Sequence, residues 1–141
     1  MSTTKKLLLL LLVIVLLSGV FIALLCVQRK PGVILGGPYT YSEYIRGKKQ
    51  RFCEVPPDLA DEIDQWLLCG RWWTIDLVSY APGQGVRSEN FHLNCIGDTV
   101  VLNYKRKPDD KVYLQYSCLM DDVILGIMKR ISDQESNDRE Q

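Results

Sequence analysis

The chain has 141 residues, with 17 basic and 17 acidic side chains, a formal net charge of zero and 47% hydrophobic content. This balance excludes a strongly basic surface over the whole chain, so we expect no nucleic-acid partner. Outside the apolar N-terminal stretch about 110 residues remain, which is a common size for one folded domain.

A hydrophobic stretch, Leu7 to Val27, dominates the N-terminal part of the chain; it is interrupted only by Ser18 and Gly19 and carries no charged residue. About twenty such residues in a helix cover the roughly 30 Å hydrocarbon core of a bilayer. The sequence therefore predicts a signal-anchor helix that spans a membrane after a short N-terminus, residues 1–6. Two alternatives stay open. A cleaved secretory signal would have a shorter apolar run and a small-residue cleavage site. A lipoprotein signal would use Cys26, but Leu25 stands where a small residue is wanted.

The orientation of this helix is not decided by its flanking charges, because basic residues stand on both sides. An even number of cysteines in about 110 residues fits two disulfides in an oxidising compartment, and four reduced core thiols are the alternative. With disulfides, the N-terminus is cytosolic and the domain is extracytoplasmic, in a periplasm, a lumen or the cell exterior. The candidate disulfide residues are Cys53, Cys69, Cys95 and Cys118.

Residues 28–38 are expected to form a linker, because prolines and glycines interrupt regular structure there. The tyrosine-rich residues 39–44 are a candidate first strand, or an aromatic band at the lipid interface. We interpret the basic run 46–51 as a solvated turn, and a patch that contacts anionic headgroups is the alternative.

The first helix of the domain is predicted to begin at Asp58, a suitable N-cap after two prolines, and to end before Gly70. Its apolar residues recur on one face, as in a helix that packs on a core. They are Leu59, Ile63, Trp66 and Leu67. The acidic residues of this segment mostly lie off that face, so a solvated surface is favoured over a metal or acid–base cluster.

Four strand-like runs joined by short turns follow, and they predict an antiparallel meander with one covered face. Their ranges are 71–81, 86–96, 99–107 and 111–119. Inward positions include Cys95 and Cys118, on strands that are near neighbours in a meander. Cys53 and Cys69 instead flank the predicted helix, which is about 18 Å long. A disulfide between helix and sheet is equally compatible with the sequence.

A second helix is expected from residue 121 or 122 to residue 131, and the tail 132–141, which has no apolar residue, is expected to be disordered. The domain 39–131 is thus α+β, with a helix packed on a four-stranded meander and a C-terminal helix. This order resembles the cystatin-like plan in topology only. The Gln-x-Val-x-Gly signature of that family is not matched by Gln84-Gly85-Val86-Arg87, so the resemblance implies no protease inhibition.

The search for reactive groups returns no catalytic, cofactor-binding or metal-binding motif, and we expect no cofactor. His92 is the only histidine and has no neighbouring nucleophile, and no Cys-x-x-Cys pair occurs. Trp72 and Trp73 point to opposite faces of one predicted strand, so both cannot lie in the same core. An exposed Trp would suit contact with a partner or ligand, and the alternative is that the C-terminal helix or the N-terminal segment covers the second face. The candidate partner-contact residues are Trp72, Tyr80 and His92.

These features predict a membrane-tethered interaction module that acts through contact with a protein at or near the membrane, where tethering raises effective concentration. Catalysis is the less favoured expectation. The alternative is a small ligand-binding or hydrolase-like domain with a cleft on the open face of the sheet. The polar residues that could serve such a cleft are Thr74, Asp76 and His92.

Overall fold

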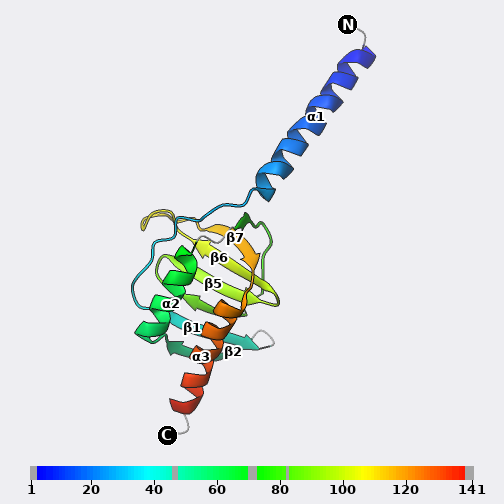
Figure 1. Cartoon of the computed structure of the whole chain (residues 1–141). Helices are drawn as coiled ribbons and strands as arrows, with labels where there is room; N and C mark the ends of the chain where they lie inside the picture. The colour runs from blue at the N-terminus through cyan, green and yellow to red at the C-terminus, as the bar shows by residue number, and fades with distance from the viewer. Residues whose placement is uncertain (1–2, 46–47, 70–72, 82, 139–141) are drawn as a thin grey trace.

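The computed structural model describes residues 3–45, 48–69, 73–81 and 83–138. In these ranges α1 projects away from a domain in which α2 and α3 lie on one face of a sheet (Figure 1). The elements in chain order are α1 (Thr3–Cys26), β1 (Thr40–Ile45), β2 (Lys48–Glu54), α2 (Pro57–Leu68), β3 (Thr74–Ile75), β4 (Gln84–Arg87), β5 (Phe91–Ile96), β6 (Thr99–Tyr104), β7 (Leu114–Leu119) and α3 (Asp122–Asp138).

The sheet has seven strands within the described ranges, in the order β2-β1-β4-β5-β6-β7-β3, and all neighbours are antiparallel. The α+β class is confirmed. The predicted meander is correct in part, because β5, β6 and β7 lie within three of its four runs. The single strand predicted over residues 86–96 is wrong, because the chain turns between Arg87 and Phe91 and forms the antiparallel pair β4 and β5. The four-stranded cystatin-like plan is not confirmed. A hairpin of β1 and β2 adds to the meander because Tyr41 of β1 lies opposite both Cys53 of β2 and Val86 of β4. Most of the basic run that we interpreted as a turn therefore belongs to β2.

The predicted strand 71–81 is mostly wrong, because only Thr74 and Ile75 form β3 at the sheet edge beside β7. The chain then has to pass three strands to reach β4. We call residues 76–81 the crossing segment. The Gln115 side chain, which points away from the helices, donates a hydrogen bond to the carbonyl of Val78. Val101 points the same way and is only 2% exposed. The crossing segment therefore covers part of the sheet face that we expected to be open.

The core lies between α2, α3 and the inner face of the sheet. All four predicted core residues of α2 are buried, which confirms its apolar face. Trp66 packs edge-on against Trp73, with ring centroids 5.8 Å apart and an interplanar angle of 89°. Alternation also correctly predicts the inward residues of the central strands, which are Phe91, Leu93, Cys95, Val100, Leu102 and Tyr104. Val112 does not follow this pattern, because it precedes β7 and is 72% exposed.

The C-terminal helix α3 continues to Asp138, so the prediction of a disordered tail is wrong for residues 132–138. Ile131 and Ser132 are buried, and one packed face lets a polar sequence continue as a helix. The start of α3 is linked to α2 through Asp121. Its Oδ1 accepts hydrogen bonds from the Ile124 N–H at 3.1 Å and from Nε1 of Trp66 at 3.0 Å.

The predicted linker, residues 28–38, contains no helix or strand but is held against the domain. Arg29 and Trp73 exchange two backbone hydrogen bonds, of 2.6 and 2.8 Å. Val33 and Leu35 are half-buried against the core. The Tyr39 hydroxyl accepts a hydrogen bond from the Gly36 N–H at 2.9 Å. The start of the domain is thus fixed to the chain that leaves α1.

Helix α1 is long and apolar enough to cross a membrane. The span Thr4–Cys26 covers 23 residues with a mean hydropathy of 3.3, and none of its most apolar part is buried. A helix that is hydrophobic all round and touches no core needs a different apolar environment. This property fits a membrane anchor and a secretory signal alike.

No disulfide joins the five cysteines, all of which lie in the described ranges. The strand order gives the reason. Two disulfides among the four candidates would require at least one pair within Cys53, Cys95 and Cys118, which lie on β2, β5 and β7. Val100 of β6 stands between Cys95 and Cys118, so even this closest pair is about 10 Å apart across two strand spacings. A disulfide needs Cα atoms within about 7 Å.

Candidate partner-contact surface

Polar side chains form a row on the outer face of the sheet, the face opposite α2 and α3. Strand register places Arg87 of β4 opposite His92 of β5, and His92 opposite Asn103 of β6. Because neighbouring strands lie about 4.8 Å apart, these three side chains stand side by side although they come from different strands. The next position of the row is Gln115 of β7.

The row opens into a cavity that we call the notch. Its volume is about 290 Å³, and it is lined by Arg87, His92, Asn103 and Tyr113. None of these four side chains is acidic. Together they offer a guanidinium, an imidazole, an amide and a phenol, which are all hydrogen-bond donors.

The turn between β4 and β5 positions the first two lining residues. The Ser88 hydroxyl accepts hydrogen bonds from the backbone N–H groups of Asn90, at 3.2 Å, and Phe91, at 3.1 Å. The Ser88 N–H in turn donates to the Phe91 carbonyl at 2.9 Å. This closed turn fixes the register in which Arg87 and His92 face each other.

The electrostatics of the notch favour a neutral histidine beside a fixed positive charge. Burial lowers the pKa of His92, and the nearby Arg87 guanidinium lowers it further. The imidazole is therefore neutral at pH 7, with one ring nitrogen as donor and the other as acceptor. On the other side, Nζ of Lys105 lies 5.5 Å from the ring centroid of Tyr113.

The crossing segment is organised around Asp76, which is nearly buried. Its carboxylate accepts hydrogen bonds from the Val78 N–H at 2.9 Å and from the Tyr80 hydroxyl at 2.7 Å. Burial alone would raise the pKa of Asp76, but these bonds, with others from Ser117 and Gln115, outweigh burial and lower it. Asp76 thus holds a loop in place.

The polar residues named for a catalytic cleft are not brought together. Asp76 pairs with Gln115, which lies two strands from His92 in the same row, so Asp76 and His92 are about 14 Å apart. Thr74 lies beside Ser117, in the next row. The arrangement offers no general base within hydrogen-bond reach of a second reactive group among these three.

The three predicted partner-contact residues have different outcomes. Trp72 lies outside the described residues, while its neighbour Trp73 is fully buried. Tyr80 is 37% exposed, but its hydroxyl is engaged by Asp76, a bond that raises the pKa of Tyr80. His92 lines the notch. The other three lining residues were missed because only the register shows that they meet.

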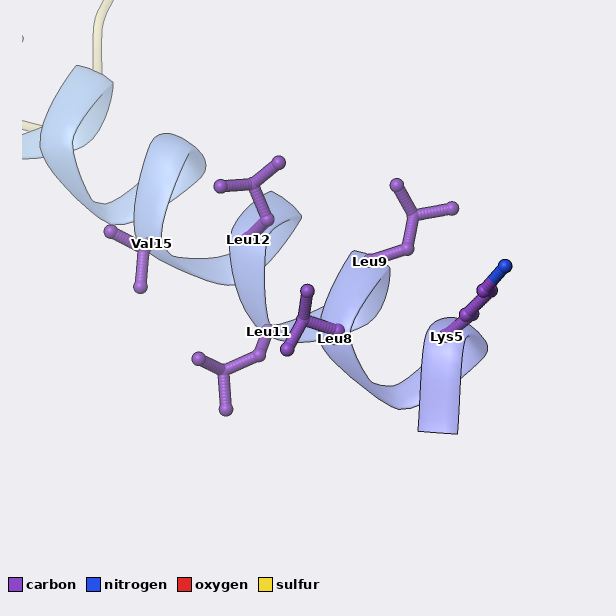
Figure 2. A pocket seen from close by; sticks show the side chains of 6 residues that line it. All are labelled: Lys5, Leu8, Leu9, Leu11, Leu12 and Val15. Atoms are coloured by element: carbon purple, nitrogen blue, oxygen red, sulfur yellow. The ribbon is translucent and has the colours of Figure 1, made fainter. Parts of the chain in front are cut away.

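The exposed surface of α1 is the other unpartnered feature. Figure 2 shows side chains that extend outward from one side of this helix. They are Lys5, Leu8, Leu9, Leu11, Leu12 and Val15. The hollow between them is a groove on a single helix and not a ligand pocket, because all six residues are exposed.

Among the described residues, no group of three or more His, Cys, Asp or Glu side chains is arranged to hold a metal ion. No protein-family model, no curated protein and no solved structure matches this chain.

Proposed function

We propose that this chain is a membrane-tethered interaction module that contacts another protein at the membrane surface through the outer face of its sheet. The observation that carries the proposal is the exposed apolar helix α1 joined by a docked linker to a domain with its own core. A domain that completes its core without α1 leaves that helix available for a bilayer.

The outer face has the composition of a contact surface. Tyr113 lines the notch, and Val112, which precedes it in the chain, and Val78 of the crossing segment are exposed. Val78 is held there by the Gln115 side chain, next to Asn103 in the row. Tyr and Arg, which both line the notch, are enriched in protein–protein interfaces.

The proposal includes an orientation, with residues 1–6 in the cytosol and the domain on the other side of the membrane. The flanking charges, Lys5 and Lys6 before α1 and Arg29 and Lys30 after it, are compatible with this orientation and with the reverse one. Disulfides would have indicated an oxidising, extracytoplasmic compartment, but none is present, so the side of the membrane on which the domain lies has to be measured directly. Protease digestion of intact membranes provides it, and cleavage of the domain only from the cytosolic side would refute this orientation.

Site-specific photocrosslinking tests the contact. We expect a photoreactive residue at Val112, beside the notch, to form an adduct with a membrane-fraction protein. The same residue at Leu125, exposed on α3 on the opposite face, serves as the control. The adduct should be lost when residues 3–26 are replaced by a cleavable signal. Equal adducts at both positions, or none at either, would refute the proposed contact surface.

A second candidate, a small-ligand-binding domain, is favoured by the notch itself. A cavity of about 290 Å³ is near the lower end of the volumes that hold small molecules. The two candidates differ in the dependence on α1, because a soluble ligand should bind equally well with and without the membrane helix.

A further inference from the structure

The notch combines one fixed cation with neutral donors and excludes acidic groups from its lining. Arg87 supplies a planar guanidinium at one end of the row, and its side chain is exposed at the surface. His92 and Asn103 continue the row across the next two strands, and Tyr113 closes it from the loop before β7. Every lining group can donate a hydrogen bond toward the same space.

This donor set matches an oxyanion. An arginine fork binds a carboxylate or a phosphate with two parallel hydrogen bonds, and neutral amide and hydroxyl donors complete the remaining lone pairs. A cation would meet the positive charge of Arg87 and no carboxylate. An apolar ligand would leave four polar groups without partners.

We propose that the notch is a carboxylate-binding site that receives an acidic side chain or a C-terminal carboxylate of the protein partner. This inference rests on the proposed function, and it names the chemistry by which the partner is recognised. A single guanidinium among the lining groups matches the single negative charge of a carboxylate. A phosphate dianion would call for a second cation in the lining.

The surroundings of the notch favour a peptide over a small free acid. The exposed Val112 adjoins Tyr113, and Val78 lies beside the next position of the row, so apolar contacts can form around an acidic group that enters the notch. A free carboxylic acid would use the notch alone. A partner segment with an acidic residue beside apolar ones would use both.

The single histidine makes the test specific. Because His92 is the only histidine in the sequence, its imidazole NMR signals report on the notch without assignment of the rest of the chain. The probe is a blocked peptide of four glutamates, titrated into the tag-free full chain in nonionic micelles and Tris buffer. A blocked peptide of four glutamines is the neutral comparison.

We expect the glutamate peptide to shift the His92 signals saturably and the glutamine peptide to leave them unchanged. Arg87→Gln should weaken binding by about tenfold or more, because it removes the charge-assisted fork. Tyr113→Phe should weaken it by a smaller factor. Lys129→Gln removes the same charge from exposed α3 on the opposite face and should leave binding within about twofold, as expected for a screened distant charge.

Equal weakening by Arg87→Gln and Lys129→Gln would overturn the proposal, since it would show general attraction between charges. A shift by inorganic phosphate that depends on Arg87, without a shift by the peptide, would also overturn it and assign the notch to phosphate. If the peptide fails but the crosslink at position 112 persists in Arg87→Gln, the carboxylate site is wrong and the interaction module stands. If the peptide binds and the crosslink is absent, the carboxylate site stands and the interaction module is wrong.

Discussion

Replacement of Asp76 by alanine should detach the crossing segment from the sheet and destabilise the domain. The Asp76 carboxylate accepts hydrogen bonds from the Val78 N–H and the Tyr80 hydroxyl. Both donors belong to exposed residues, so water replaces part of what they lose. At about 1 kcal/mol for each of these two bonds, and with further bonds from Ser117 and Gln115, Asp76→Ala should lower the free energy of unfolding by about 2 kcal/mol or more. In a domain of this size this corresponds to roughly 10 °C in the melting temperature.

The variants of this pair separate loop anchoring from a general effect of charge. Tyr80→Phe removes one bond and should cost about half as much. The double variant should cost less than the sum of the two single changes, because the same bond is removed in both. Asp109→Ala, in the exposed turn before β7, is the matched control and should change stability by less than about 0.5 kcal/mol.

The pH dependence of the stabilisation by Asp76 provides an independent test. The pKa of Asp76 is lower in the folded chain than in the unfolded chain, because the hydrogen bonds outweigh burial. The stabilisation is therefore complete above the unfolded pKa of about 3.9 and is lost as pH falls through the folded pKa. Urea unfolding of the full chain in micelles, followed by tryptophan fluorescence, measures both effects. A loss below about 0.5 kcal/mol at pH 7, or a difference from wild type that grows below pH 4, would refute this reasoning.

Three further predictions concern the core, the sheet and the thiols. Ile127→Ala, at a fully buried position of α3, should cost about 2 to 5 kcal/mol, while Val123→Ala on its exposed face should cost less than about 0.5, as measured by urea unfolding. Gly85→Ala should destabilise by roughly 2 kcal/mol or more, because a Cβ there would lie 2.3 Å from the Leu93 carbonyl oxygen of β5; a stability equal to that of wild type would contradict this packing. Maleimide should label the exposed Cys69 in the folded chain but reach Cys95 only after unfolding, because burial raises the pKa of Cys95 to about 12; labelling of Cys95 at the same rate as Cys69 would contradict its burial.

The sequence predicts the elements whose signals are local. The helix Pro57–Leu68 is correct in type and face, because its apolar residues have helical spacing and are buried in the core. The predicted N-cap is wrong, because Pro56 occupies that position and Asp58 lies in the first turn. Residues 91–96 and 99–104 are also correct as strands, because their alternation places Leu93 and Leu102 in the core. In both cases the spacing of apolar residues along the sequence directly gives the buried face of the element. The burial of Val101 on the other face was not predicted.

The parts that were missed depend on contacts between distant residues. The sequence of β2 resembles a basic turn, and only its pairing with β1 makes it a strand. Strand β3 has only two residues because the chain then leaves the sheet edge and crosses the outer face. The notch has the same origin. Arg87, His92 and Asn103 belong to three strands, and no spacing rule links them before the register is known. The disulfide prediction from an even cysteine count is wrong for the same reason, because the strand order decides how far apart the cysteines lie.

The docked linker limits the distance between the domain and the end of α1. Only Val27 and Gln28 separate the end of α1 at Cys26 from Arg29, which is bonded to Trp73 at the sheet edge. With α1 in a bilayer, this edge lies within about 10 Å of the membrane surface, the reach of three extended residues. In that arrangement the domain stays close to the membrane surface, so its nearest neighbours are lipid headgroups and the membrane-proximal parts of other proteins in the same bilayer.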